Sequence, residues 1–264
     1  MSQAEKAQRF SSLHRSGDPL FLYNIWDAGG AKIVAETGAQ AIATGSMSVA
    51  LAHGYEDGQQ IPLDLVLRIV SRICETVDLP VTVDFEGGYA ETDEGLATNV
   101  ARLIATGAVG LNFEDQISGG AGLHSTEAQC NRIATIRKTA EAQGVSLFVN
   151  ARTDLFLHER DRTKHAHLLD EAIARAQAYE KAGANGFFVP GLTDIAALKT
   201  ICDAVSLPVN AMRTGTAPSM AELASAGIAR ISCGPGPYFD FVAGMKASIA
   251  ARSETLTGRL PHSS

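Results

Sequence analysis

Several absences narrow the classes of protein to which this sequence can belong. Its four cysteines form no CxxC pair and no zinc-ligand spacing, so we expect reduced thiols in a cytoplasmic protein. No apolar run approaches the roughly 20 residues of a membrane span, and residues 1–10 are too polar for a signal peptide. The 22 basic residues are outnumbered by 29 acidic ones, and a net charge of −7 argues against a nucleic-acid-binding surface. We therefore expect neither membrane nor nucleic-acid partners.

What is present is a regular alternation of short apolar runs with longer amphipathic segments. Eight runs are expected to be strands: 20–26, 41–46, 80–86, 110–115, 147–154, 186–191, 208–213 and 229–234. Eight segments have apolar residues at helical spacing: 31–37, 63–77, 94–106, 127–143, 168–182, 195–205, 220–226 and 238–256. Two helix starts carry the capping-box spacing, Thr126 with Gln129 and Ser219 with Glu222.

This alternation predicts a single (β/α)8 barrel that occupies residues 1–264. One such barrel typically needs about 250 residues. Residues 1–19 are left as an N-terminal helix or extension and residues 257–264 as a tail. The Leu-Pro-Val triplet that opens a strand at residues 79–81 recurs at 207–209, 128 residues later, which equals four units of 32. A doubly wound open sheet, the alternative, needs an edge and a switch point that nothing in the sequence marks.

In a barrel of this kind the active site lies where the strands end, and polar side chains gather at those positions. Because side chains alternate along a strand, three neighbouring strands each direct a pair of polar side chains to one face: Asp84 and Glu86, Asn112 and Glu114, Asn150 and Arg152. Carboxylates this close repel unless they share protons or bind a cation. Oxygen ligands without His or Cys suit Mg²⁺, with Mn²⁺ as the second choice. The alternative is a set of ion pairs and strand-end caps.

A second group of residues at the strand ends predicts an anionic substrate. The guanidinium of Arg152 can bind a carboxylate or phosphate through two parallel hydrogen bonds. Ser46, which follows Gly45, offers a hydroxyl and a backbone N–H to the same anion, and Asn210 is a further candidate substrate-binding residue. Asp57 is either an additional acidic group of this site or an ordinary turn residue before Gly58.

Four segments carry a resemblance to a known family: VDFEGGY at 83–89, GLNFEDQ at 110–116, NARTD at 150–154 and RAQAYEKAGA at 175–184. In order and spacing they resemble the phosphoenolpyruvate mutase/isocitrate lyase superfamily, over about residues 23–238. The resemblance implies a Mg²⁺-dependent barrel that acts on small α-oxo or α-hydroxy acids through an enolate-like intermediate. Asp84 is then the direct metal ligand, and Glu86, Glu114 and Asp57 hold metal-bound waters. Ser46 and Arg152 bind the substrate carboxylate or oxyanion.

The sequence departs from the specialised branches of that superfamily. The lyases carry a Lys-Lys/Arg-Cys-Gly-His loop after the fourth strand, and residues 117–124 here contain neither the lysine nor the cysteine. The lyase glutamate after the sixth strand is replaced by Gly191, and the lysine and asparagine of the mutase gating loop are absent. His124 is a candidate catalytic acid in the glycine-rich loop, with a solvated loop histidine as the alternative. We expect residues 118–122 to form a lid.

A site that keeps its metal and anion groups but lacks the specialised acid fits a carbon–carbon lyase, of decarboxylating or retro-aldol type, acting on a small di-acid. Two alternatives stay open. One is a phosphoryl mutase or P–C hydrolase, and the other is a non-catalytic metabolite-binding barrel. Members of the resembled family often exchange their last helix between subunits, so the resemblance also implies a homo-oligomer, a dimer or tetramer, with a swapped helix at 238–256.

Overall fold

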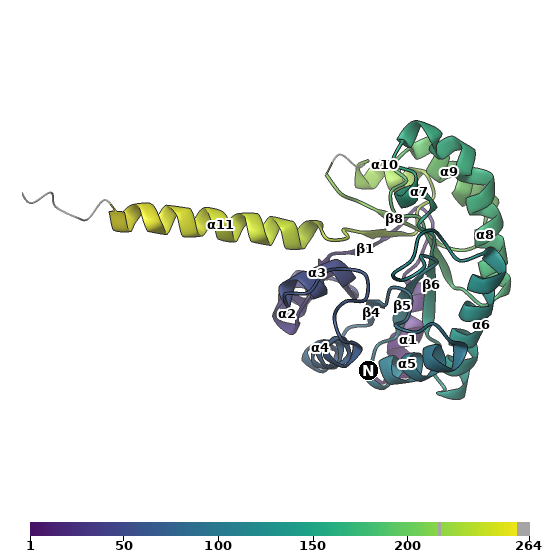
Figure 1. The fold of residues 1–264 in the computed structure, drawn as a ribbon, viewed down its shortest axis with the longest axis horizontal. Coiled ribbons are helices and arrows are strands. Elements are labelled where there is room, and N and C mark those ends of the chain that lie inside the picture. The colour runs from purple at the N-terminus through teal and green to yellow at the C-terminus, as the bar shows by residue number, and fades with distance from the viewer. Residues whose placement is uncertain (216–217, 258–264) are drawn as a thin grey trace, which may run out of the picture.

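The computed structural model describes residues 1–215 and 218–257, and its centre is a barrel of parallel strands (Figure 1). The strands are β1 (Leu20–Leu22), β2 (Asn24–Ile25), β3 (Ile42–Thr44), β4 (Val81–Asp84), β5 (Gly110–Glu114), β6 (Phe148–Arg152), β7 (Gly186–Phe188), β8 (Val209–Met212) and β9 (Arg230–Ser232). Each pairs in parallel with its neighbours in the order β1-β9-β8-β7-β6-β5-β4-β3-β2. All eight predicted strands are present, so the alternation of apolar runs located them correctly.

The first predicted strand closes the barrel, although it is interrupted at Tyr23. Its first part, β1, pairs with β9, and its second part, β2, pairs with β3. Asn24 explains the break, because its side-chain oxygen accepts hydrogen bonds from the N–H groups of Cys233 and Gly234 in place of a strand partner. The predicted (β/α)8 barrel is thereby confirmed, and the open-sheet alternative is wrong because both ends of the sheet meet at this segment.

Helices surround the barrel, and all eight predicted ones are present. They are α2 (Ala28–Glu36), α4 (Leu63–Thr76), α5 (Asp93–Ala105), α6 (Thr126–Ala142), α8 (Leu169–Lys181), α9 (Ile195–Ala204), α10 (Met220–Ser225) and α11 (Gly236–Thr257). The sequence did not predict α3 (Ser46–Ala52), α7 (Leu155–His158) or a 3₁₀ turn (Arg162–Leu168), since each is too short to show a helical period. The N-terminal extension contains α1 (Gln3–Ser12).

One of the two predicted capping boxes is correct. Ser219 and Glu222 cap α10 reciprocally, as their spacing predicted. At α6 the prediction is wrong by one residue, because Ser125, not Thr126, caps the helix and accepts a hydrogen bond from the N–H of Ala128. Gln129 is then free to turn inward, where its amide donates to the backbone oxygen of Glu114 at 2.9 Å and ties α6 to the end of β5.

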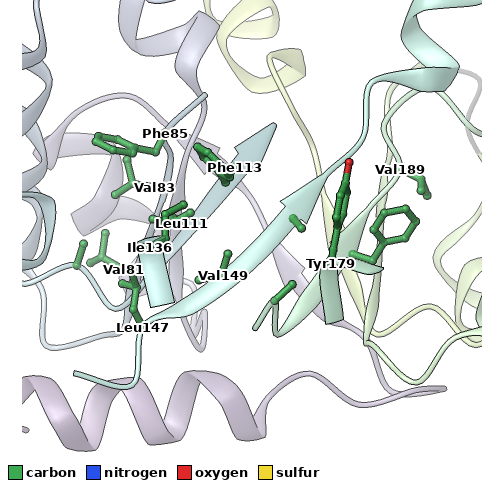
Figure 2. Close-up of a cluster of buried hydrophobic side chains, with 14 of the residues drawn as sticks. Val81, Val83, Phe85, Leu111, Phe113, Ile136, Leu147, Val149, Tyr179 and Val189 are labelled. Atoms are coloured by element: carbon green, nitrogen blue, oxygen red, sulfur yellow. The ribbon is translucent and has the colours of Figure 1, made fainter. Parts of the chain in front are cut away.

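Alternate residues of the strands face two different environments. Val83, Leu111, Phe113 and Val149 point outward and pack in the buried layer beneath the helices (Figure 2). The inward positions include buried polar side chains that are joined by hydrogen bonds. A separate apolar cluster, which includes Leu20 and Leu22, packs with Phe10. At the N-terminal end of the strands, α1 inserts Phe10 against Phe148 and seals the bottom of the barrel. The open, C-terminal end is therefore the end available to a ligand.

The last helix, α11, does not pack along the barrel like the others but projects away from it (Figure 1). Its 22 residues expose large apolar side chains, among them Phe241, Met245 and Ile249. The flank of the barrel between β1 and α2 is also not covered by a helix, and Phe21, Tyr23 and Ile33 are exposed there along a groove of about 600 Å³.

All four cysteines are free thiols. No helix within the described ranges is both long and apolar enough to cross a membrane.

Candidate active site

A cavity of about 190 Å³ lies at the C-terminal ends of the strands and brings together five of the predicted site residues: Gly45, Ser46, Asp57, Asp84 and Arg152. Four further polar residues line it that were given no site role from the sequence: Asn24, Ser48, Asn112 and Ser232. The strand alternation had placed Asn112 on the same face as Glu114 but assigned it no function. The remaining wall is largely apolar and is formed by Met47, Leu157, Phe188, Pro190, Met212 and Pro235.

Asp84 ends β4 and is held in place by groups from β3 and α3. Because α3 begins directly after β3, it places Ser46 next to the Asp84 carboxylate, whose Oδ2 accepts from the Ser46 hydroxyl at 3.0 Å and from its N–H at 3.3 Å. The backbone N–H of Asp84 donates to Thr44 Oγ1 at 3.1 Å. Its other carboxylate oxygen, Oδ1, is buried and has no hydrogen-bond partner in the described part of the chain. One oxygen of Asp84 is thus fixed and the other is available.

Glu86 and Glu114 lie beside Asp84, and both are buried. The Glu86 side chain accepts one hydrogen bond, from the N–H of Gly58 at 3.3 Å, and its Oε2 has no partner among residues 1–215 and 218–257. Burial, together with the nearby carboxylates of Asp84, Glu114 and Asp57, raises the pKa of Glu86 to about 9. Burial also raises the pKa of Glu114, although Arg152 opposes this effect. This crowding of carboxylates favours either bound protons or a bound cation.

Arg152 is the positive charge of the cavity. Asp154 binds it through two hydrogen bonds, from Nε to Oδ1 at 2.5 Å and from Nη2 to Oδ2 at 2.9 Å. The remaining nitrogen, Nη1, lies 3.0 Å from Glu114 Oε2 and 3.9 Å from Asp84 Oδ1. Although burial disfavours its charge, these three carboxylates raise the pKa of Arg152 well above its ordinary value. The side chain is therefore a fixed cation with one nitrogen directed at the carboxylate cluster.

These residues fit a Mg²⁺ or Mn²⁺ ion that is bound mostly through water. Among the described residues, no group of three or more His, Cys, Asp or Glu side chains is arranged to enclose an ion by itself. The free oxygens of Asp84 and Glu86 instead fit one direct carboxylate ligand, with the other acids reaching the ion through water. Mg²⁺ is commonly bound in this way, with one or two carboxylates and several retained waters.

Four predicted site residues do not line this cavity: Glu86 and Glu114, which lie beside Asp84, and Asn210 and His124, which lie elsewhere. Asn210 is completely buried below it, where its side-chain oxygen accepts from Asn150 at 3.0 Å and its amide donates to the backbone oxygen of Ala211 at 2.8 Å. His124 lines a separate cavity of about 420 Å³ beside Tyr89, Ser118 and Arg132. Burial and the charge of Arg132 lower the pKa of His124. The structure thus does not bring Asn210 or His124 to Asp84 and Arg152.

The glycine-rich segment after β5 contributes Ile117 and Ser118 to the cavity that contains His124, and it is fixed at its two ends. Gln116 and Leu123 form an isolated antiparallel bridge, and the N–H of Ile117 donates to the oxygen of Gly122 at 3.1 Å. The return of the segment is anchored at His124, whose N–H donates to the backbone oxygen of Asp115. Arg175 binds both the backbone oxygen of His124 and the buried carboxylate of Asp115. Residues 118–122 therefore form a short loop whose two ends are held by hydrogen bonds.

Comparisons with known proteins agree with this fold. The family model described as phosphoenolpyruvate phosphomutase matches residues 10–252. The 2-methylisocitrate lyase of Escherichia coli K12 is 30% identical over 236 residues, which cover 87% of this chain and 78% of the enzyme. The crystal structure of a Burkholderia cenocepacia J2315 protein, named as a candidate phosphonomutase, is 45% identical with a TM-score of 0.92, covering 95% of this chain and 99% of that one.

A more distant solved structure shares the fold. A phosphonopyruvate hydrolase, crystallised with oxalate and Mg²⁺, superposes with a TM-score of 0.82 at 18% identity and covers 99% of this chain and 92% of that one. Relatives of this chain thus include a lyase, a candidate phosphonomutase and, by fold, a P–C hydrolase. The comparisons agree on the scaffold while the named reactions differ.

Proposed function

The chain belongs to the phosphoenolpyruvate mutase/isocitrate lyase superfamily, and we propose that it is a Mg²⁺-dependent enzyme that cleaves a carbon–carbon bond of a small α-oxo or α-hydroxy di-acid. The observation that carries the proposal is Asp84, which presents one free buried carboxylate oxygen next to the charged Arg152. A free anionic ligand beside a fixed cation suits a site that receives a metal ion and an acidic substrate together.

In this proposal the residues of the cavity bind and orient the substrate. Among the described residues, Arg152 is the only arginine or lysine that lines the cavity, so we assign the recognition of a substrate carboxylate to its Nη1. The Ser46 hydroxyl, which donates to Asp84 Oδ2 in this structure, can bind the same acid only by turning its single hydrogen from Asp84 to the substrate. When bound, the cation supplies positive charge beside the oxygen on which negative charge develops as the bond breaks. Asp84 holds the ion directly, and Glu86, Glu114 and Asp57 hold its water ligands.

The side chains that line the cavity favour a reaction in which the bond breaks without proton donation by the protein. Leu157, Phe188 and Met212 form an apolar part of the cavity wall, and within residues 1–215 and 218–257 the titratable side chains that line the cavity are Asp57, Asp84 and Arg152. Decarboxylation of an oxaloacetate-like acid meets this condition, because the bond breaks without proton delivery to a leaving group. His124 remains our candidate acid for a retro-aldol cleavage. Since it lines the neighbouring cavity, that role requires movement of the 118–122 segment.

A second candidate function is a phosphoryl mutase or P–C hydrolase, favoured by the 45% identity to a candidate phosphonomutase. A metabolite-binding barrel without turnover is the third. A substrate panel separates the three: oxaloacetate and alkylmalates for the lyase, phosphonopyruvate for the mutase or hydrolase, each with Mg²⁺ and with EDTA. Release of pyruvate or a related oxo acid from the first group supports our proposal. Two results contradict it: turnover of phosphonopyruvate but of no other substrate in the panel, or ligand-induced shifts of the melting temperature without turnover of any substrate.

We further propose that the protein is a homo-oligomer, a dimer or tetramer, in which α11 is exchanged between subunits. Two bare apolar surfaces support this: one face of α11, with Phe241, Met245 and Ile249, and the groove between β1 and α2. In a (β/α)8 barrel the last helix normally covers the flank beside the first strand. The corresponding helix of a second copy is the natural occupant of that flank.

A further inference from the structure

The turn that carries Glu86 has an unfavourable backbone conformation. Glu86 has a φ of 49° and Tyr89 a φ of 56°, with Gly88 between them at 81°. Residues with a side chain seldom adopt this left-handed region, because their Cβ approaches the backbone oxygen. Within the described ranges, the third non-glycine residue of this kind is Gln59, whose side chain contacts the same turn. Such strain persists only where the surroundings enforce it.

The enforcing contacts come from three different parts of the chain. Arg132 of α6 donates from Nη2 to the backbone oxygen of Gly87 at 2.5 Å, and both of its terminal nitrogens lie 3.3 Å from the oxygen of Ala90. Asn99 of α5 donates its amide to the oxygens of Gly88 and Tyr89 at 3.1 and 2.9 Å. The side-chain oxygen of Gln59 accepts from the N–H of Tyr89 at 2.5 Å. All four carbonyl groups from Gly87 to Ala90 are therefore bound by side chains.

Packing presses the turn against the same helices. A Cβ at Gly88 would lie 2.4 Å from Leu96 Cδ1 and 3.2 Å from Phe113 Cε2, so the backbone is in close contact with both side chains. The Arg132 guanidinium also lies over the Phe113 ring, 5.3 Å from its centre. At the other end of the turn, the backbone oxygen of Glu86 accepts from the N–H of Glu114. The sheet thus holds the start of the turn, and Arg132, Asn99 and Gln59 hold the rest.

Arg132 is buried against these carbonyl groups and the Phe113 ring. It is 7% exposed, and no carboxylate in the described part of the chain lies within 4.0 Å of it. Burial of an unpaired cation is costly, so its hydrogen bonds to the turn must offset a large desolvation penalty. Arg137, five residues further along α6, likewise binds backbone oxygens, those of Gly183 and Leu147, at the closed end of the barrel. The two arginines differ in which end of the barrel they hold.

We propose that Arg132 is a positioning residue that holds the turn 86–90 in its left-handed conformation and so directs the Glu86 carboxylate toward Asp84, which sets the affinity for the divalent cation. This rests on the cation site of the proposed function. Without Arg132, the turn relaxes toward ordinary φ values at Glu86 as well as at Tyr89, because the sheet holds only the backbone oxygen of Glu86. Glu86 then leaves the cluster, and one water-mediated ligand of the ion is lost.

The test compares Arg132→Met with Arg137→Met, its matched control on the same helix, and with the conservative Arg132→Lys. Two readouts are taken without substrate: Mn²⁺ affinity from the free-ion electron paramagnetic resonance signal, and hydrogen exchange of the peptide 85–91 in metal-free protein. We expect Arg132→Met to weaken Mn²⁺ binding at least about tenfold and to accelerate exchange of this peptide, with Arg132→Lys in between. Arg137→Met lowers the melting temperature but leaves Mn²⁺ affinity within about twofold of the wild type.

A double-mutant cycle tests whether Arg132 affects the affinity for Mn²⁺ through Glu86. If Arg132 acts by directing Glu86, Arg132→Met adds little loss of Mn²⁺ affinity to a Glu86→Gln protein. Additive losses, or unchanged Mn²⁺ affinity and exchange in Arg132→Lys and folded Arg132→Met, overturn the positioning role. Wild-type protein that binds no Mn²⁺ overturns the cation site itself. The exchange measurement still decides in that case whether Arg132 holds the turn, so the two failures are distinguishable.

Discussion

Asp154 holds Arg152 by two parallel hydrogen bonds, and this pairing leaves only Nη1 of the guanidinium facing Asp84 and Glu114. The backbone N–H of Asp154 is itself fixed by the buried carboxylate of Asp115 at 3.0 Å. The orientation of the one cationic group in the cavity is therefore set by a chain of buried acids behind it. A lysine cannot reproduce this arrangement, since it lacks the planar fork of donors.

We therefore expect Arg152→Lys to reduce kcat/KM at least about 100-fold, because the ammonium cannot bind Asp154 in two places and direct a third donor at the substrate. Steady-state kinetics with the substrate from the panel checks this, with circular dichroism to confirm folding. Arg162→Lys, an exchange of the same type at an exposed position, serves as the control and should have wild-type kinetics. Equal kinetics for the two variants would show that Arg152 does not bind the substrate.

The stability of the metal-free protein should depend on pH through Glu86. Its pKa in the folded state, about 9, lies above its ordinary value of 4.5, so the folded state binds this proton more tightly than the unfolded state does. The free energy of unfolding then falls as the pH rises from about 4.5 to about 9, by up to about 1.4 kcal/mol per pH unit for one group. Urea denaturation in EDTA at several pH values measures this slope.

Glu86→Gln should reduce that slope, because it removes one of the two carboxyl groups whose pKa is raised and leaves Glu114 to titrate. Glu91→Gln, at an exposed position five residues along, should leave the slope unchanged. Parallel slopes for the wild type and Glu86→Gln would mean that Glu86 titrates normally in the folded protein. Saturating Mg²⁺ should weaken the pH dependence in the wild type, since the cation replaces the proton.

The glycine-rich segment 118–122 should behave as a lid. It is a short excursion between the bridged residues Gln116 and Leu123, so closure over the mouth requires few backbone changes. Limited proteolysis within this segment should slow when Mg²⁺ and oxalate are both present, and much less with either one alone. Cleavage at the same rate in all four conditions would argue against a lid.

Exchange of α11 predicts that its apolar face controls assembly. Phe241→Asp and Ile249→Asp place a charge on the face that we assign to the neighbouring subunit, so each should shift the protein toward the monomer in light scattering after size-exclusion chromatography. Lys246→Glu, at a position that is already charged and exposed, is the control and should retain the wild-type assembly. A monomeric wild-type protein would refute the exchange.

The sequence predicted the parts of this protein that depend on periodicity. Alternation of apolar runs located every strand, and the rule that strand ends form the site brought Asp84, Arg152 and Ser46 together correctly. The spacing of residues predicts on which face of a strand a side chain lies, but not how far it lies from the open end of the barrel. For this reason Asn210 was assigned to the substrate, although it is fully buried and Met212, two residues later, lines the cavity.

Features set by loop conformation and tertiary contacts escaped prediction. His124 lies in a different cavity because its backbone pairs with Asp115 and Arg175, and no local pattern reveals that contact. The left-handed conformation of Glu86 and Tyr89 also has no local cause, since both residues carry side chains. It depends on Arg132 and Asn99, which lie on two other helices.

We propose above all that Asp84 binds a divalent cation and that cleavage of the substrate depends on this cation. The most direct measurement is the initial rate of oxo-acid release as Mg²⁺ is added to EDTA-treated wild-type protein and to Asp84→Asn. We predict a saturable return of activity in the wild type and none in Asp84→Asn at any Mg²⁺ concentration, with both proteins folded. Full turnover in EDTA, or equal Mg²⁺ dependence in the two proteins, would contradict the account.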